Sequence, residues 1–166
     1  MQKLILSVLF GIVLIFWGCS SDSKKSEEQT QDQSEQAESE LTEFQLKNGI
    51  GPITEPIKTG PIDTQMAARG KELFDSNCSS CHKIGERYVG PDLQDVTSRR
   101  TPTYIMNMIL NPTGMTQEHP TAHKLLEQFA TQMANLSLER DKARAIVEYL
   151  RSVNPNLQTS KAQPNN

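Results

Sequence analysis

The sequence predicts one small all-α domain with additional segments before and after it. Residues 65–77 and 138–153 carry apolar side chains at helical spacing. Two further segments begin at Pro102 and Pro120, and proline is well tolerated at the first position of a helix. These observations predict a fold of short packed helices. The 166-residue chain, with a formal net charge of -3, is long enough for one such domain and its flanking segments.

The first 18 residues have the pattern of an export signal. Lys3 precedes an almost wholly apolar run from Leu4 to Trp17. As a helix this run would span about 21 Å, which is less than the roughly 30 Å hydrocarbon layer of a membrane. Gly18 followed by Cys19 resembles the cleavage site of bacterial lipoproteins. The sequence therefore predicts a signal peptide over residues 1–18 and a lipid on Cys19, with plain secretion or an uncleaved anchor as alternatives.

Residues 19–43 are predicted to form a disordered acidic tether. From Ser20 to Glu43 the chain has eight acidic residues, two basic residues and no aromatic one. Such a segment has too little apolar surface to offset its ordering entropy. A flexible chain of this length has a root-mean-square span of about 25 to 30 Å, so the tether would let a domain reach its partners.

Residues 44–62 are rich in glycine and proline, and this composition argues against a helix or a long strand. We expect an extended segment that wraps over the domain. Asp63 or Thr64 is then expected to cap a helix over residues 65–77. Gly70 lies in the middle of that helix, where glycine costs roughly 1 kcal/mol relative to alanine, and this indicates that another helix approaches closely there.

The predicted helix runs into Cys78-Ser79-Ser80-Cys81-His82, which is the attachment pattern of a c-type haem. In that pattern both thiols bond covalently to the haem and the histidine binds its iron. Residues three apart share a helix face, so both sulfurs can meet one edge of a flat ring. For these five residues alone, a chance match, a dithiol redox pair and half a zinc site remain alternatives. The chain has three cysteines, and none is left for a disulfide once Cys19 carries a lipid.

Residues 102–110 and 120–131 are each predicted to form a helix, with proline at the first position. Asn111 precedes a proline and is expected to end the first of them. The last helix is expected over residues 138–153, with Ser137 as its cap. Apolar residues of the two middle helices are expected to form the walls of the haem pocket and much of the core: Tyr104, Ile105, Met108, Ile109, Leu125, Leu126 and Phe129.

The chain from about Asp63 to Asn154 resembles a class I monohaem cytochrome c domain. In that family a glycine and an aromatic residue of the first helix cross an aromatic residue of the last helix, and Gly70, Phe74 and Tyr149 match. The resemblance implies a small all-α fold whose helices pack around one covalently bound haem c. We therefore expect the domain over residues 63–154, followed by a disordered tail over residues 155–166.

The segment Gly90-Pro91-Asp92-Leu93 matches the family's Gly-Pro-x-Leu segment. The resemblance implies that the carbonyl of Pro91 accepts a hydrogen bond from the imidazole of His82, which fixes the ring and raises its basicity. It also places Pro91 and Leu93 among the residues that contact the haem.

The iron needs a second axial ligand, and a soft thioether is common in cytochromes. The candidates in the chain are Met106, Met108, Met115, Met133, His119 and His123. Met106 and Met108 lie inside a predicted helix, where packing is the commoner role. The resemblance favours Met133, because the family places its ligand in the short loop before the last helix. Met115 is the principal alternative.

A zinc site built from Cys78, Cys81, His119 and His123 is the formal rival to the haem. The 37 residues between the cysteine pair and the histidine pair exceed the usual spacing of about 12 to 15 in zinc fingers. The two histidines are instead expected to be surface residues on a short helix, with His119 near its cap.

A haem with both axial positions filled by protein has no open site for a substrate and exchanges single electrons. The sequence thus predicts an electron carrier and not an enzyme in its own right. The chain around residues 87–91 and 99–112 is also similar to cytochromes that accompany nitrous oxide reductase. A domain with an open or labile sixth site, which would bind gases or act as a sensor or peroxidase-like site, is the alternative.

The expected partners are redox proteins, which dock weakly over small areas. The donor would be a quinol-oxidising complex or another cytochrome, and the acceptor a terminal reductase or oxidase. Together with the lipid on Cys19, this predicts a monomer on the periplasmic side of a bacterial membrane, with no nucleic-acid partner.

Overall fold

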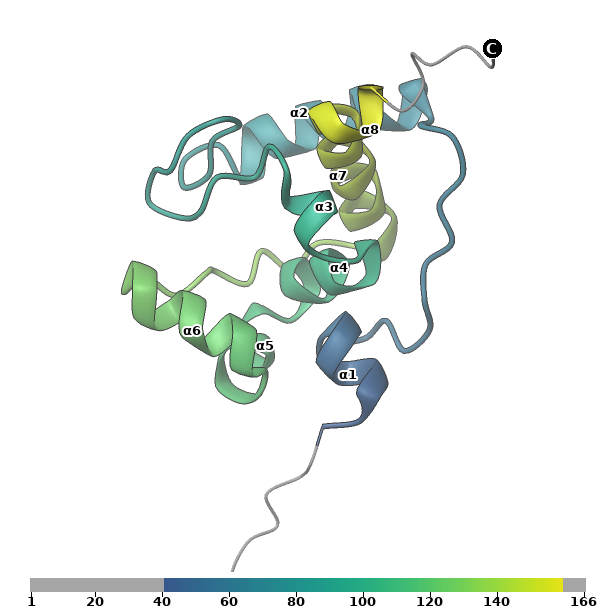
Figure 1. Ribbon diagram of the computed structural model, residues 1–166. Coiled ribbons are helices and arrows are strands. Elements are labelled where there is room, and N and C mark those ends of the chain that lie inside the picture. The colour runs from purple at the N-terminus through teal and green to yellow at the C-terminus, as the bar shows by residue number, and fades with distance from the viewer. Residues whose placement is uncertain (1–40, 160–166) are drawn as a thin grey trace, which may run out of the picture. The chain divides into compact units, whose positions relative to one another are not determined.

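The computed structural model describes residues 41–159, whose regular structure is helical (Figure 1). The predicted all-α class is therefore confirmed for this part of the chain. The helices run in the order α1 Glu43–Asn48, α2 Thr64–Asn77, α3 Val96–Arg99, α4 Pro102–Leu110, α5 Pro112–Glu118, α6 Pro120–Phe129, α7 Arg140–Ser152 and α8 Pro155–Thr159.

Several predictions fall on residues that the structure does not describe. The signal peptide over residues 1–18, the lipid site at Cys19, most of the tether over residues 19–43 and the end of the tail lie outside the described residues. Within residues 41–159, none of the helices combines the length and the apolar character that a membrane crossing requires.

The crossing of α2 and α7 is the main helix contact of the fold. Gly70 of α2 is buried, and a Cβ there would collide with the backbone carbonyl of Ala145. One turn further along α2, the ring of Phe74 packs against Tyr149 with ring centroids 5.3 Å apart. Glycine is thus required at residue 70 because the backbones of the two helices touch, as the resemblance implied.

The hydrophobic core lies between α2, α4 and α7. Val147 and Ala143 of α7 are fully buried and Ile53 contributes from the segment before α2. The other buried members of this cluster are Phe74, Cys78, Val96, Ile105, Met106, Ile109, Ile146 and Leu150.

The prediction of no helix in residues 44–62 was wrong at its start, because α1 occupies Glu43–Asn48. Thr42 and Gln45 form a reciprocal capping box, which satisfies the first backbone donors of this helix. Gly49 ends it with a φ of 79°, a conformation that favours glycine. The helix breakers of this segment begin only at Gly49, so the residues before it are free to form a helix.

The rest of the segment is not helical and lies across α4, where Asn107 holds it. The Asn107 side chain is fully buried and accepts a hydrogen bond from the Ile53 amide at 3.0 Å. It donates to the carbonyls of Asn48 and Ile53, both at 3.0 Å. One asparagine therefore satisfies three buried backbone groups of residues 48–63, which we call the N-terminal segment.

The N-terminal segment is also joined to α7, through the carboxylate of Glu148. This side chain is 1% exposed and accepts hydrogen bonds from the Asp63 amide, Arg144 and Arg151. Burial acts to raise the pKa of Glu148, but these donors outweigh it and hold the pKa below its usual value. The buried charge is thus compensated, and Arg151 also donates to the carbonyl of Gly60 at 2.7 Å.

Several helix boundaries differ from the prediction. α2 begins at Thr64 and not at 65, and α7 ends at Ser152 and not at 153. α6 ends at Phe129 and not at 131, because Ala130 takes a left-handed conformation. The last helix begins at Arg140 and not at 138, because Ser137 has a φ of 50° and therefore does not cap it. The predicted tail over residues 155–166 begins with α8, Pro155–Thr159. The short helices α3 and α5 were not predicted.

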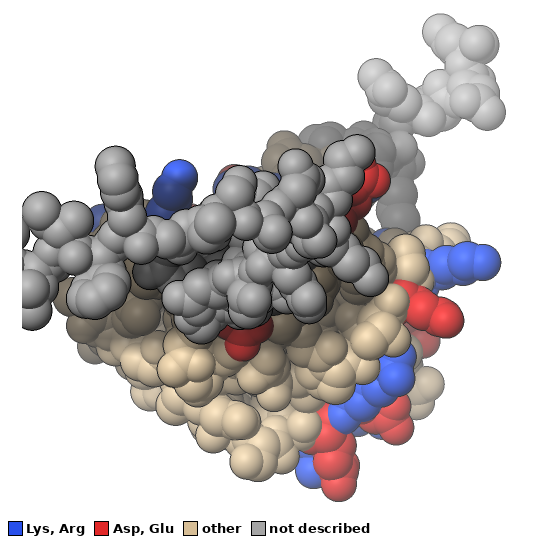
Figure 2. Space-filling model, turned by 90° about the horizontal axis from the view of Figure 1, so that it is seen from below, with Lys and Arg blue, Asp and Glu red and all other residues tan. Residues whose placement is uncertain are grey.

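On the face seen in Figure 2, charged side chains of both signs gather along the right-hand side, and the lower left of the face is uncharged. On the part of the face in Figure 2 that grey atoms do not cover, acidic and basic residues lie next to one another. Exposed pairs such as Lys71 with Asp75, at 2.6 Å, are of this kind. This face therefore presents a mixed charge pattern and not a field of one sign.

Candidate functional site

A cavity of about 290 Å³ opens beside the C-terminal end of α2. Its walls come from the loop of residues 78–93, from α4 and α6, and from the segment between α6 and α7. All seven residues predicted as pocket walls line it, namely Tyr104, Ile105, Met108, Ile109, Leu125, Leu126 and Phe129. The cavity is therefore mostly apolar and suits a flat hydrophobic ligand.

The two thiols lie at one wall of this cavity. Cys78 is the C-cap of α2, and its carbonyl accepts hydrogen bonds from the amides of Cys81 and His82 at 3.0 and 2.8 Å. Cys78 is buried whereas Cys81 is exposed, and neither is in a disulfide. Burial, with a smaller contribution from Cys81, raises the pKa of the free Cys78 thiol to about 11.

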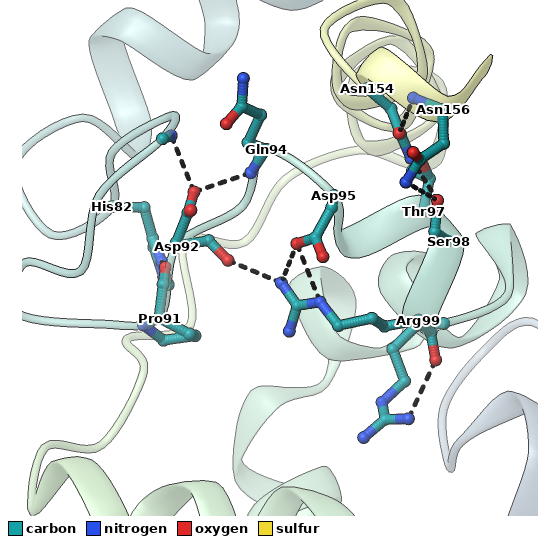
Figure 3. A network of polar contacts seen from close by, with 12 residues as sticks. His82, Pro91, Asp92, Gln94, Asp95, Thr97, Ser98, Arg99, Asn154 and Asn156 are labelled. Atoms are coloured by element: carbon teal, nitrogen blue, oxygen red, sulfur yellow. Dashed lines mark hydrogen bonds and ion pairs between the residues drawn. The ribbon is translucent and has the colours of Figure 1, made fainter. Parts of the chain in front are cut away.

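The imidazole of His82 lines the same wall and is oriented by the following loop. Its Nδ1 lies 3.2 Å from the carbonyl oxygen of Pro91, to which it donates when Nδ1 carries the proton (Figure 3). That tautomer leaves the lone pair of Nε2 free to bind a metal. Burial lowers the pKa of His82, although the Pro91 carbonyl acts in the opposite direction. The neutral form is the form in which imidazole is a ligand.

Gly90 lies directly against this imidazole. A Cβ at residue 90 would stand 2.5 Å from Cε1 and 2.8 Å from Nδ1 of His82, closer than real Cβ contacts come. The Gly90 amide also donates to the carbonyl of Cys81 at 2.8 Å. Glycine at residue 90 is therefore needed for close approach of the loop to the ring.

Asp92 fixes the loop that carries Pro91. Its Oδ1 accepts hydrogen bonds from the amides of Gly85 and Gln94 at 2.8 and 2.9 Å (Figure 3). Arg99 donates to the Asp92 carbonyl at 2.9 Å and pairs with Asp95. The sequence analysis missed this role of Asp92. A carboxylate two residues before the amide that it binds is typical of an Asx turn.

Among the methionines proposed as axial ligands, Met133 and Met108 line the cavity. Met106 belongs to the hydrophobic core. Met115 is fully buried in a second cluster, and its sulfur accepts a hydrogen bond from the Ile50 amide at 3.0 Å. The sulfur of Met115 is therefore engaged by the N-terminal segment, whereas Met133 reaches the cavity from the segment before α7.

The two histidines outside the motif do not line this cavity. His119 is 1% exposed, so the expectation of a surface residue was wrong for it. Its Nε2 lies 3.1 Å from the Leu46 carbonyl, and its Nδ1 accepts from the Thr121 amide at 3.2 Å. His123 is exposed, and its Nδ1 lies 3.0 Å from the Thr116 carbonyl.

The rival zinc site is not assembled in the described part of the chain. Within residues 41–159, no three His, Cys, Asp or Glu side chains come together as a metal site. Both histidines of the rival set are bonded to backbone groups away from the cysteines. The structure therefore does not favour this alternative.

One end of the cavity is polar. A haem that fits this cavity would place its propionate groups at such an end. The Tyr104 hydroxyl is buried and has no hydrogen-bond partner, alone among the buried side-chain N and O atoms of the described residues. Arg99 and Arg100 line the cavity with it, and the Arg100 guanidinium lies 5.3 Å from the centre of the Tyr104 ring. A carboxylate entering at this end would meet the positive charge of Arg99 and Arg100. An apolar cavity with thiols and an imidazole at one wall and this polar end fits a haem with its propionates.

Leu93 also lines the cavity, so all six residues expected to bind the cofactor lie at its walls: Cys78, Cys81, His82, Pro91, Leu93 and Met133. Val89 and Leu136, which are partly exposed, line its mouth. The arrangement can hold a ring between two walls and leave one edge close to solvent.

Comparison with known proteins is consistent with this fit. The family model described as "Cytochrome c" matches residues 67–154. A "Cytochrome c-553-like" protein of Synechocystis sp. (strain PCC 6803) is 36% identical over 55 residues, which are 32% of this chain and 50% of that protein. The chain thus matches about half the length of this relative.

Solved structures of similar proteins extend the match over most of the described residues. A cytochrome c from Rhodothermus marinus is 44% identical, with a TM-score of 0.64 over 68% of this chain and 97% of that one. An engineered cytochrome c from the same organism, Rma TDE, is also 44% identical, with a TM-score of 0.63 over 66% and 96% of the two chains. A further structure of that engineered protein, with a TM-score of 0.60 at the same identity and coverage, is bound to a carbene intermediate.

Proposed function

The chain belongs to the cytochrome c family, with a covalently attached haem c as its cofactor, and we propose that it is a membrane-anchored carrier of single electrons between respiratory proteins. The cofactor supplies the chemistry, a one-electron change between ferrous and ferric iron. The rest of the proposal concerns what the residues of this chain do around it.

Six residues of the cavity have a defined role in this proposal. Cys78 and Cys81 would hold the ring covalently, and His82 would bind its iron. The Pro91 carbonyl orients His82, and Leu93 packs against the ring. Met133 is the second axial ligand. The observation that carries the proposal is that His82 and Met133, 51 residues apart in the sequence, line the same apolar cavity.

Closure of the cavity from both sides is what makes a carrier and not an open catalytic site. The apolar walls exclude water from the iron, and two protein ligands leave no position for a substrate. Tyr88, Val89 and Leu136 are large apolar residues exposed at the surface, and the last two lie at the cavity mouth. They support electron exchange with partners that dock weakly over a small area.

Anchoring and location rest on the first residues of the chain. The apolar run before Cys19 supports export and lipidation. We propose that the lipid on Cys19 holds the protein on the periplasmic side of a bacterial membrane. A tether over residues 19–43 would then let a monomeric domain reach donor and acceptor.

The partners are proposed from the resemblance of residues 87–91 and 99–112 to cytochromes that accompany nitrous oxide reductase. A quinol-oxidising complex or another cytochrome would supply electrons, and a terminal reductase of that kind would receive them. An oxidase is the alternative acceptor.

A second candidate function is a gas-binding or sensor domain with a labile sixth site. One observation favours it: within the described residues, the backbone of residues 131–138 makes no hydrogen bond to other backbone. In a carrier Met133 would bind the iron when no external ligand is present, whereas in a sensor it would not.

Substitution of the methionines tests the proposed function. The oxidised protein is expected to show the near-infrared charge-transfer band of a sulfur ligand on iron. Met133→Ala should abolish this band, because it removes the thioether that lines the cavity. Met115→Ala tests the other candidate ligand, whose sulfur accepts a hydrogen bond from the Ile50 amide, and it should not abolish the band. Loss of the band in Met115→Ala alone would overturn the assignment of Met133.

A further inference from the structure

The segment that carries Met133 depends on side chains for its position. Residues 131–138 run between α6 and α7 without backbone-to-backbone hydrogen bonds in the described structure. Ala130 and Ser137, at its two ends, have φ values of 49° and 50°. Such left-handed conformations are uncommon for residues other than glycine and cost of order 1 kcal/mol each. A ligand on this segment therefore needs a specific tie to the rest of the fold.

The side chain of Gln132 makes such a tie to α5. Its Oε1 accepts a hydrogen bond from the Thr116 hydroxyl at 2.9 Å. Its Nε2 lies 3.4 Å from the Pro112 carbonyl oxygen and 3.2 Å from the carbonyl oxygen of Met133. Thr116 and Pro112 are both buried. One amide thus connects the backbone of Met133 to a buried turn of a neighbouring helix.

The orientation of this amide is determined by its partners. Rotation by 180° would place Oε1 against the carbonyl oxygens of Pro112 and Met133, so that acceptors would face acceptors. The Thr116 hydroxyl has one proton and also lies 2.9 Å from the Pro112 carbonyl oxygen, so it shares this proton between acceptors. Gln132 therefore contributes donors to Pro112 and Met133 in addition to accepting from Thr116.

The turn to which Gln132 is tied is itself held in place. Asn111 caps α5 and donates to the Ile50 carbonyl at 3.1 Å. Met115 of the same helix accepts from the Ile50 amide. α5 thus has polar contacts on two sides, with the N-terminal segment and with Gln132.

We infer that Gln132 is a positioning residue that keeps Met133 within reach of the haem iron. The inference rests on the proposed role of Met133 as axial ligand. When the tie is removed, Met133 is displaced from the iron for a larger fraction of the time. An external ligand then binds with an apparent affinity that rises in proportion to that fraction. Loss of one or two net hydrogen bonds corresponds to a change of about tenfold.

Titration of the oxidised full-length holoprotein with imidazole tests this inference. Gln132→Ala should lower the apparent dissociation constant of imidazole about tenfold and weaken the near-infrared band. Gln128→Ala is the matched control, because it removes an exposed side-chain amide from α6. The hydrogen bond from Arg87 to residue 128 is kept, since its acceptor is the backbone carbonyl. That variant should behave like the unchanged protein.

Thr116→Val provides a second test that does not depend on Gln132 alone. Valine keeps the volume but removes the hydroxyl, so imidazole affinity should rise partway toward that of Gln132→Ala. In the Thr116→Val background, Gln132→Ala should have a smaller effect than in the unchanged protein, because the two residues share one tie.

The outcomes separate this inference from the proposed function. Suppose that Met133→Ala raises the imidazole affinity, while Gln132→Ala has the same imidazole affinity as the control Gln128→Ala. The positioning role of Gln132 is then overturned, while the assignment of Met133 as a ligand stands. A lower urea midpoint for Gln132→Ala with unchanged imidazole affinity would also overturn it, since the role would then be structural. If Met133→Ala leaves imidazole affinity unchanged, the ligand assignment fails and this inference fails with it.

Discussion

The contact between Gly90 and His82 is the residue-scale feature on which the site depends most closely. The glycine allows the loop to pass against the imidazole face, and the next residue then presents its carbonyl to Nδ1 at 3.2 Å. Ring orientation and tautomer are therefore set by backbone atoms that follow directly in the chain. Such an arrangement holds a metal ligand without a charged partner.

Gly90→Ala should disturb His82 without touching the thiols. The added Cβ forces the ring or the loop to move, so we expect a loss of about 1 to 3 kcal/mol in the free energy of unfolding. Gly60→Ala is the control, because nothing lies within 4 Å of a Cβ at that residue, and it should change the free energy by less than about 0.5 kcal/mol. Urea denaturation of the holoproteins compares the two. Equal stability of both variants would show that the contact at residue 90 does not constrain the ring.

The side chains in the haem-attachment motif were predictable from the sequence because their spacing is itself the signal. Asp92 and Gln132 were missed for a different reason. The partners of Gln132 lie 16 and 20 residues away on α5, and no local pattern marks an amide that bonds to a distant helix. His119 was also placed wrongly, since its ring contacts the Leu46 carbonyl of α1, a helix that was not predicted.

Helix starts were the most predictable features at the scale of elements. Proline is the first residue of α4 and α6, and Asp63 caps α2, as predicted. The short helices α1, α3, α5 and α8 were missed because four to seven residues show too little periodicity. In α1 and α5, side-chain caps and packing against the rest of the domain replace that periodicity.

Gly70→Ala is expected to weaken the packing of α2 against α7. Helix propensity alone would make Gly70→Ala stabilising by about 1 kcal/mol. We expect the opposite sign, a loss of about 1 to 3 kcal/mol in the free energy of unfolding. The reason is that the added Cβ meets the backbone of Ala145. Thermal unfolding of the holoprotein measures the change.

The control for this substitution lies on the same helix. Ala68 is exposed, so Ala68→Gly reports propensity alone and should cost roughly 1 kcal/mol. A stabilised Gly70→Ala variant would show that the helices can separate at the crossing without penalty.

The whole molecule combines a compact domain with a chain segment that no isolated pattern predicts. Residues 49–63 are held by Asn107 of α4 and by Glu148 and Arg151 of α7. The sequence indicated that this segment is not a regular helix and wraps over the domain. It could not indicate which buried side chains receive it, because these lie 54 to 91 residues away. The cavity, by contrast, was predictable, since motif and apolar pattern agree.

Exposure of the reduced protein to carbon monoxide tests the central claim most directly. The claim is that His82 and Met133 close the iron from both sides. The account predicts that, at neutral pH, the visible spectrum of the ferrous holoprotein stays unchanged under a saturating atmosphere of the gas, and that Met133→Ala acquires a carbon monoxide spectrum. Rapid and complete conversion of the unchanged protein to the carbon monoxide form would contradict the account and favour the gas-binding alternative.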